Sequence, residues 1–299
     1  PSKAKLDLIK YWNSDPEVQE IHDEFIENTL SNFYMPFGVA PNFIIDGENY
    51  TLPMAIEESS VVAAASKSAK YWSKRGGFHT KIINVEKTGH IHFLYDGKKN
   101  EIKKFFKNYK KQLIESCDDI SLKMKKRGGG ILSMDLIDKT LDLKNYFQIS
   151  VCFDTINAMG ANFINSCLEK TAETLKDVFL KSSLSKKYEL EIIMSIMSNY
   201  VPNCLVKSWV SCPLEDLNEN DGINGREFAE KFITAVNISK ADTSRAVTHN
   251  KGIMNGIDSI VLSTGNDFRA VESSIHAYAS KSGKYQGLTN AFIKNGIFT

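Results

Sequence analysis

The pattern of apolar residues between about residues 84 and 199 is the feature that most constrains the fold of this chain. Strict alternation of apolar and polar residues predicts strands, and apolar residues three or four positions apart predict helices. The predicted elements are a strand at 90–95, a helix at 100–117, strands at 131–137 and 146–153, a helix at 159–179 and a strand at 190–197. This βαββαβ order is typical of a ferredoxin-like unit.

The sequence on both sides of this stretch predicts one larger domain that the ferredoxin-like unit interrupts. The first part contains two short helices before residue 28, a β-hairpin around Asp46-Gly47 and a helix at 58–72. The second part contains a strand at 204–212, a polar loop at 218–225 and helices at 227–237 and 268–280. We therefore predict an α+β fold in which residues 1–84 and 200–299 form a large domain around an inserted domain at 85–199.

Length and charge exclude several classes of protein. The 299 residues are enough for two domains, and 37 basic against 36 acidic side chains argue against a general nucleic-acid-binding protein. No apolar run approaches the ~20 residues that span a bilayer, and no secretory signal opens the sequence. We therefore predict a cytoplasmic protein that has neither nucleic acid nor a membrane as its partner.

Cysteine and histidine give little sign of a metal site. The five cysteines are odd in number and form no CxxC pair, which favours reduced, mostly buried thiols. His90 and His92 share one face of a predicted strand, but no third ligand accompanies them. We therefore predict no metal.

Residues suited to catalysis gather at 245–272, in RAVTHNKGIMNGIDSIVLSTGNDFRAVE. Lys251 precedes an apolar run, so its segment is predicted to be buried, and a buried ammonium requires a charged or hydrogen-bonding partner. Asp267 is a candidate partner. The structural alternative is that Lys251 reaches solvent while Asp267 only caps a helix beginning at Phe268, and spacing alone favours that alternative.

Two loops of the predicted ferredoxin-like unit have features that bind phosphate groups. One places Lys125, Lys126 and Arg127 before three glycines, and the other, at 157–162, opens a helix whose N-terminus favours an anion. Lysine runs are usually solvated faces and glycine triplets are usually loops. Neither loop has the Rossmann GxGxxG motif, so each alone is a weak indication of a dinucleotide site.

The segment THNKGIMNGID, followed by TGNDFRAVE, resembles the catalytic segment of class II 3-hydroxy-3-methylglutaryl-coenzyme A reductases, the bacterial and archaeal branch of that family. Residues 157–162, NAMGAN, resemble the DAMGAN cofactor-binding motif of the same family, with Asn157 in place of the aspartate. Glu27 and Asn28 stand where the family has an ENVIG-like segment, although the residues after them differ. The resemblance extends from about Glu27 to the end of the chain, with its motifs in the family's order.

The resemblance implies roles for the residues that match family motifs. The catalytic candidates are Glu58, Lys251 and Asp267, and the substrate-binding candidates are Ser60, Arg245 and Asn255. The cofactor-binding candidates lie in the two loops and are Arg127, Gly128, Gly129, Asn157, Met159, Gly160 and Asn162.

The resemblance also implies a homodimer with active sites at the subunit interface, and a reaction in mevalonate and isoprenoid biosynthesis. That reaction interconverts hydroxymethylglutaryl-CoA and mevalonate by two hydride transfers with NADPH or NADH, and the basic residues at 123–127 favour NADPH. Lys251 would stabilise the oxyanion, and Arg245 would pair with the substrate carboxylate. Glu58 could donate a proton if burial raises its pKa, and Asp267 would hold both groups in one network.

The resembled family has a further catalytic histidine, which protonates the departing CoA thiolate and lies in a C-terminal flap beyond the position of Thr299. We therefore expect residues 1–299 alone to bind substrate and cofactor yet to reduce the thioester slowly. The alternative function is a CoA- and nucleotide-binding homologue that does not turn over. The presence of Glu58, Lys251 and Asp267 together favours an enzyme.

Overall fold

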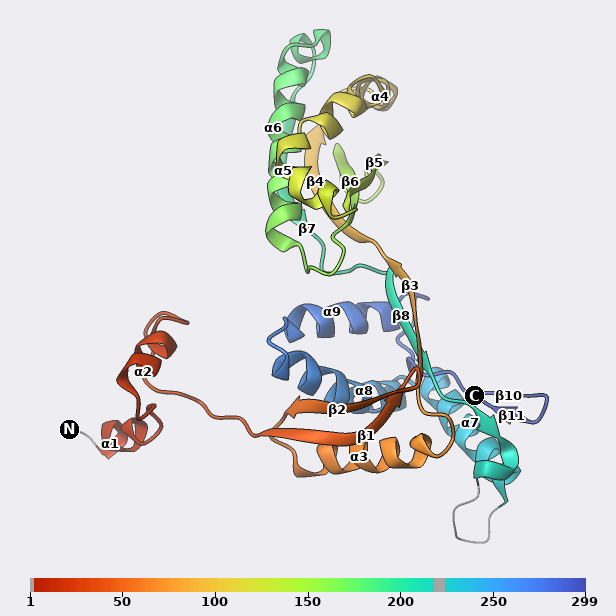
Figure 1. Ribbon diagram of the computed structural model, residues 1–299. Helices are drawn as coiled ribbons and strands as arrows, with labels where there is room; N and C mark the ends of the chain where they lie inside the picture. Colours follow the sequence, from red (N-terminus) through yellow and green to blue (C-terminus); the bar gives the residue numbers. More distant parts are fainter. Residues whose placement is uncertain (1–2, 218–223) are drawn as a thin grey trace. The chain divides into compact units, whose positions relative to one another are not determined.

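The computed structural model describes residues 3–217 and 224–299, and the chain divides into two compact units (Figure 1). The first unit combines Pro1–Phe78 with His249–Phe268, and the second combines His79–Thr248 with Arg269–Thr299. The polar loop predicted at 218–225 lies outside the described residues except for its last two positions. The predicted domain boundaries at 84/85 and 199/200 stay a prediction.

The first unit is built on a β-hairpin covered by a helix. Strands β1 (Phe37–Ile45) and β2 (Glu48–Ala55) pair in antiparallel register around Asp46 and Gly47, whose φ angles of 50° and 88° suit a tight turn. Helix α3 (Ser59–Ser73) packs against β1, and α8 (Thr243–Ser263) adds its residues from His249 onward. The predicted hairpin and the helix that follows it are confirmed.

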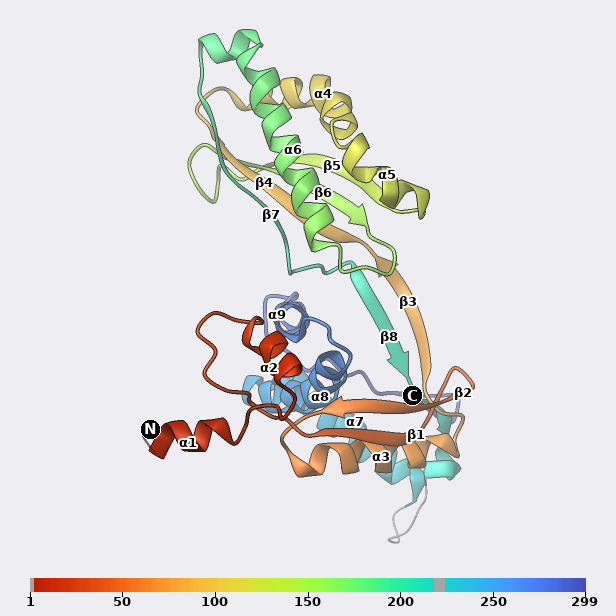
Figure 2. The same ribbon diagram turned by 60° about the vertical axis from the view of Figure 1, so that its left-hand side comes forward.

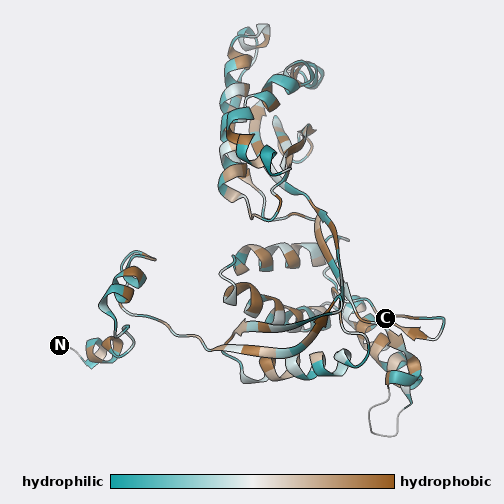
Figure 3. Ribbon diagram, viewed as in Figure 1, coloured by the Kyte–Doolittle hydropathy of each residue, from teal (hydrophilic) through white to brown (hydrophobic). Residues whose placement is uncertain are grey.

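The N-terminal arm, defined as residues 3–35, contains the two predicted short helices, α1 (Lys3–Ile9) and α2 (Pro16–Asp23). Its large apolar side chains are exposed, with Phe25 at 72%, Leu30 at 73% and Phe33 at 86%. Figure 3 shows hydrophobic residues along both helices of the arm. The described residues therefore leave this apolar surface open to solvent.

The centre of the second unit is a four-stranded antiparallel sheet with the order β5-β6-β4-β7. Its strands are β4 (Lys87–Tyr95), β5 (Gly130–Asp138), β6 (Tyr146–Asp154) and β7 (Leu190–Met197). Helices α4 (Lys99–Glu115), α5 (Asp118–Lys126) and α6 (Ala161–Leu180) cover one face (Figure 2). This is the strand order of the predicted ferredoxin-like unit. Helix α5 is an addition that the lysine-rich sequence did not indicate.

Strict alternation in β4 and β6 produces the core of this sheet. Every second residue of both strands is buried against the helices, and the fully enclosed side chains include Ile91, Phe93, Tyr95, Phe147, Ile149, Val151 and Phe153. Gly89 lets α6 approach closely, because a Cβ there would lie 2.4 Å from Leu168 Cδ1. The sheet and α6 therefore fit together because a residue without a side chain lies at their closest approach and because both contact surfaces are apolar.

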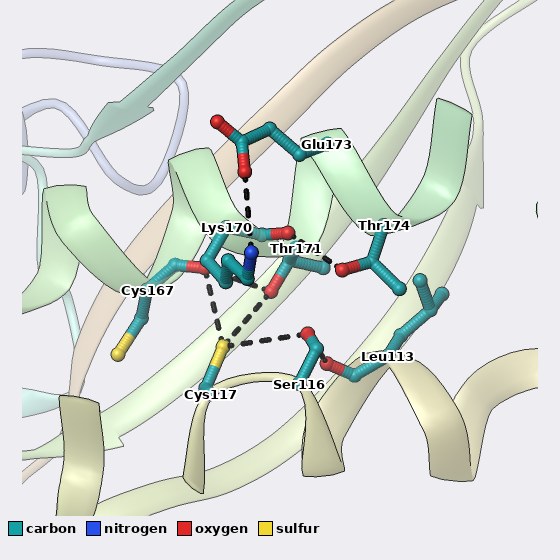
Figure 4. A network of polar contacts seen from close by, with 8 residues as sticks. All are labelled: Leu113, Ser116, Cys117, Cys167, Lys170, Thr171, Glu173 and Thr174. Atoms are coloured by element: carbon teal, nitrogen blue, oxygen red, sulfur yellow. Dashed lines mark hydrogen bonds and ion pairs between the residues drawn. The ribbon is translucent and has the colours of Figure 1, made fainter. Parts of the chain in front are cut away.

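The Cys117 thiol joins the α4–α5 junction to α6 inside this core (Figure 4). Its Sγ lies 3.3 Å from the carbonyl oxygen of Cys167 and 3.2 Å from Thr171 Oγ1. The contact with Cys117, together with burial, raises the pKa of Cys167 well above its ordinary value. All five cysteines are free thiols, and Cys117, Cys167 and Cys212 are buried.

Strands β3 (His79–Val85) and β8 (Cys204–Trp209) form an antiparallel ladder in which Val85 faces Cys204. Sequence analysis missed β3, because its Ile82 and Ile83 are both exposed and no alternation marks the strand. The remaining elements are two 3-10 helices (Ser183–Lys186 and Leu214–Leu217), β9 (Cys212–Pro213), α7 (Gly225–Ala241), α9 (Phe268–Ala279), β10 (Ile293–Lys294) and β11 (Ile297–Phe298). The predicted α+β class is confirmed.

Among the described residues, no helix combines the length and the apolar composition that crossing a bilayer requires.

Candidate functional site

The candidate active site is built on a contact between the start of α3 and the middle of α8. Glu58 directly precedes α3, with an extended backbone at φ −95° and ψ 121°. Its Oε2 lies 3.3 Å from Lys251 Nζ, and its Oε1 accepts a hydrogen bond of 3.1 Å from Ser60 Oγ. Both carboxylate oxygens therefore have partners, and the first turn of α3 fixes the Ser60 hydroxyl beside the carboxylate.

Asn255 lies one helical turn after Lys251 and completes this cluster. With its amide oriented to satisfy both groups, Asn255 Oδ1 accepts from Lys251 Nζ at 3.2 Å, and its Nδ2 donates to Lys251 O at 3.2 Å. The i, i+4 spacing on α8 makes this contact possible. Two acceptors, one charged and one neutral, thus position the ammonium.

The expectation that Lys251 lies in a buried segment is wrong, since 63% of its side chain is exposed. Helix α8 buries one face only, through residues that include Asn250, Met254 and Ser259, and Lys251 projects from another face. Lys251 pairs with Glu58, which lies far away in the sequence and which spacing did not indicate as its partner.

The condition for proton donation by Glu58, a pKa raised by burial, is not met in this structure. The hydrogen bonds from Lys251 and Ser60 hold the pKa of this carboxyl below its ordinary value. Its side chain is 46% exposed, so the cost of desolvation is small beside these two contacts. Glu58 is consequently ionised at neutral pH in this arrangement.

Asp267 and Arg245 lie on the flanks of the predicted catalytic segment. Asp267 is half-buried and immediately precedes α9, which begins at Phe268 as predicted. Arg245 lies in the first turn of α8, where its backbone N–H donates to Asp242 Oδ2 at 2.7 Å. Contacts join Glu58, Ser60, Lys251 and Asn255 into one cluster, and the roles of Asp267 and Arg245 stay predictions.

The two predicted phosphate loops meet at the end of β6. Gly129 fits against β6 so closely that a Cβ would lie 2.5 Å from Asp154 O and 3.1 Å from Ile156 Cγ1. Gly160 has a φ of 77°, and a Cβ there would lie 2.4 Å from Thr155 Cγ2. Gly160 directly precedes α6. Only glycine combines a positive φ angle with the absence of a Cβ that would collide with Thr155.

Lys87 holds the loop before α6 from the first position of β4. Its Nζ donates to Thr155 Oγ1 and to Ala158 O, each at 2.5 Å, and Thr155 Oγ1 also donates to Ala158 O at 2.6 Å. Sequence analysis missed Lys87, because the contacts span 68 and 71 positions and leave no local pattern.

A pocket of about 320 Å³ lies between α5 and α6, beside the two loops. Its lining combines apolar and cationic side chains and consists of Ile120, Lys123, Met124, Arg127, Asn162, Phe163 and Ser166. Arg127 and Asn162 were predicted as cofactor-binding residues, whereas Phe163 and Ser166 were missed because an aromatic ring and a serine in a helix have no specific signal. The remaining loop candidates, Asn157, Met159 and Gly128, stay predictions.

The paired strand histidines show the contacts of structural side chains. His92 Nδ1 lies 2.6 Å from Tyr146 Oη, and burial lowers the pKa of both His90 and His92. The described residues contain no group of three histidine, cysteine or acidic side chains placed to hold a metal ion.

A family model described as hydroxymethylglutaryl-coenzyme A reductase matches residues 2–297 of the chain. The 3-hydroxy-3-methylglutaryl-coenzyme A reductase of Archaeoglobus fulgidus is 35% identical over 272 residues, which are 90% of this chain and 58% of that protein. A Borreliella burgdorferi protein, named a probable reductase of the same kind, is 31% identical over 89% of this chain and 58% of its own length. The chain thus spans less than two thirds of the length of these relatives.

Solved structures that resemble this chain belong to the same reductase family. The class II 3-hydroxy-3-methylglutaryl-CoA reductase of Streptococcus pneumoniae bound to NADPH has a TM-score of 0.82 and is 31% identical, covering 100% of this chain and 82% of that one. Another structure of the reductase from that organism has a TM-score of 0.82 and 32% identity, covering 100% and 72%.

Proposed function

Because the chain belongs to the hydroxymethylglutaryl-coenzyme A reductase family, in its class II branch, we propose that it interconverts hydroxymethylglutaryl-CoA and mevalonate by two hydride transfers. The observation that supports this most is the contact cluster of Glu58, Lys251, Ser60 and Asn255. In this cluster, residues that match catalytic motifs of the family contact residues that match its substrate-binding motifs, although they come from separate parts of the sequence.

Lys251 supplies positive charge for an oxyanion. Hydride addition to the thioester carbonyl places a negative charge on oxygen, and an ammonium held by Glu58 and Asn255 is oriented before that charge develops. The exposed side of Lys251 leaves room for the substrate oxygen.

Glu58 becomes a proton donor only when its contact with Lys251 weakens. In the structure that contact keeps the pKa of the carboxyl low. When the ammonium turns toward a substrate oxyanion, Glu58 loses its strongest stabilising partner and its pKa rises. With the raised pKa the Glu58 carboxylate could take a proton from water, and the protonated group could then pass that proton to the substrate oxygen later in the reaction. We assign Asp267 to the same network and Arg245 to the substrate carboxylate.

The cofactor is a nicotinamide dinucleotide, NADPH or NADH, held by the two loops that meet at the end of β6. Backbone N–H groups at the start of α6 would face its pyrophosphate, and Arg127 with Gly128 and Gly129 would flank it. Asn157 can hydrogen-bond to the cofactor but brings no charge where the motif has an aspartate.

The partner in assembly is a second copy of the chain, with the active sites at the interface. The N-terminal arm supports this proposal, because it exposes aromatic and aliphatic side chains that a monomer gains nothing by leaving in water.

The test is NADPH or NADH oxidation with hydroxymethylglutaryl-CoA and, separately, with mevaldehyde. We expect both substrates to be reduced, and Glu58→Gln to slow both, because the cluster serves both hydride steps. An exposed acid of the same unit, Glu48, provides the matched control as Glu48→Gln. Binding of cofactor and CoA ester without reduction of either substrate would favour the alternative, a binding homologue that does not turn over.

A further inference from the structure

We propose that Lys87 is a positioning residue, whose ammonium group holds a strained turn at residues 155–158 closed and thereby keeps the loop before α6 ready for its ligand. This inference rests on the proposed function, since it assumes that this loop faces a dinucleotide. It assigns a role in the reaction to a residue that sequence analysis did not single out.

The turn at residues 155–158 has a backbone conformation that its sequence disfavours. Ala158 N–H donates to Thr155 O at 3.1 Å, and Ile156, inside the turn, has a φ of 55°. A β-branched residue rarely adopts a positive φ, because its side chain then crowds its own backbone. Such a conformation persists only where the surrounding contacts hold it. The turn therefore depends on partners that keep it closed.

Two side chains supply these contacts. Asp154 Oδ1 accepts a hydrogen bond of 2.7 Å from the N–H of Ile156. Lys87 Nζ donates to Thr155 Oγ1 and to Ala158 O, each at 2.5 Å, and so joins the two ends of the turn. Thr155 is fully buried, and its hydroxyl also donates to Ala158 O at 2.6 Å. Lys87 thus bonds to both members of a contact that closes the turn, from a strand outside the loop.

Lys87 also brings a positive charge into the loop. Both of its acceptors are uncharged oxygens, and among the described residues no carboxylate is in ion-pair contact with it. A part-buried cation without an anion costs free energy, and an anionic ligand nearby reduces that cost. The N-terminus of α6, directly after the loop, favours an anion as well. A loop that only connected β6 to α6 would gain nothing from this charge.

The experiment centres on Lys87→Met in the whole protein, which keeps the length of the side chain and removes its charge and its N–H donors. The matched control is Lys81→Met, because Lys81 is an exposed lysine of β3 in the same unit. Thr155→Val and the double variant Lys87→Met/Thr155→Val test whether the two residues act through one contact.

Three quantities are measured for each protein. Calorimetry gives the dissociation constants of NADPH and NADH, and steady-state kinetics gives kcat at saturating cofactor. Hydrogen exchange of the amides at 156–160, measured without cofactor, reports how often the turn opens. Unchanged exchange in β5 shows that a variant is folded.

We expect Lys87→Met to bind both dinucleotides about fivefold more weakly or worse, because an open turn lowers the fraction of protein that is competent to bind. Its amides at 156–160 should exchange about tenfold faster or more. At saturating cofactor kcat should stay within about twofold of wild type, since the bound ligand closes the turn again. Lys81→Met should match the wild type in all three quantities.

Thr155→Val should weaken binding as well, and the double variant should bind within about twofold of Lys87→Met, because both changes break the same contact. Wild-type dissociation constants in Lys87→Met, or losses in the two single variants that multiply in the double variant, would overturn the inference and leave the proposed function standing. Failure of the wild type to bind either dinucleotide would overturn both.

Discussion

Lys251 Nζ lies 3.3 Å from Glu58 Oε2, so a lysine of α8 and a glutamate before α3 form an ion pair across 193 positions of sequence. The pair is exposed on one side and held on the other by Ser60 and Asn255. A charge pair that solvent reaches contributes little to stability, so the geometry of this pair within the cluster is better explained by chemistry than by folding.

Replacement of Lys251 by alanine should lower kcat for hydroxymethylglutaryl-CoA reduction by about 10²-fold or more, because the oxyanion loses its cation. The affinity for the CoA ester should change by less than about tenfold, since the cation is needed chiefly in the transition state. Steady-state kinetics and calorimetric binding give the two quantities, and Lys67→Ala on the exposed face of α3 is the control. A variant with more than about a tenth of wild-type kcat would exclude this role.

The pKa of Glu58 should rise in Lys251→Met and rise less in Ser60→Ala, because the hydrogen bond from Lys251 is the larger cause of its depression. A depressed carboxyl pKa adds stability above its unfolded value of about 4.3, and that stability is lost as pH falls through the folded value. Carbon-detected NMR titration of the Glu58 carboxyl measures the shift directly. An identical titration curve in Lys251→Met would show that the ion pair does not form in solution.

Gly160→Ala should destabilise the protein more than Gly128→Ala. Both positions have positive φ angles, 77° and 93°, so each alanine has a backbone cost of about 1–2 kcal/mol. Only at Gly160 would the new Cβ meet a neighbour, Thr155, which adds a further ~1–3 kcal/mol of overpacking. Denaturant unfolding of the two variants separates these effects. Equal losses of stability would mean that the loop moves away from Thr155 freely.

Charged substitutions in the N-terminal arm should separate the proposed dimer. Leu30→Asp/Phe33→Asp places two carboxylates on the most exposed apolar part of the arm, where each large side chain buried by a partner contributes about 1.5–3 kcal/mol. Sedimentation velocity should show a dimer for the wild type and a monomer for this variant. Leu141→Asp is the control, since Leu141 is 96% exposed on the connection between β5 and β6. A monomeric wild type would contradict the proposal.

Sequence patterns predicted the elements whose burial is regular and missed those whose burial is not. The alternation in 146–153 and the Asp46-Gly47 turn each follow from local chemistry, and both appear where expected. Among the described residues, strand β3 pairs with β8 alone and exposes Ile82 and Ile83, so its stabilising contacts come from a segment more than a hundred positions away. Local periodicity has no access to such a pairing.

In the candidate site too, sequence patterns predicted some features and missed others. The identities of Glu58 and Lys251 came from their motifs, but the exposure of Lys251 depended on α8 being a helix that continues through Gly252, Asn255 and Gly256. These residues are poor helix formers, so propensity gave no indication of that helix. The direction of the Glu58 pKa shift followed from the contact with Lys251 and from no property of the glutamate's neighbours in sequence.

The register of β3 and β8, in which Val85 faces Cys204, brings the two ends of residues 86–203 together. Residues 86–203 can therefore be deleted, and a short hairpin turn can join Val85 to Cys204 while β3 and β8 stay paired. By the same geometry, the two ends of the removed piece lie side by side, as insertion into a turn between two paired strands of another protein requires. Gene rearrangement can thus exchange residues 86–203 in one step, without re-routing the rest of the chain.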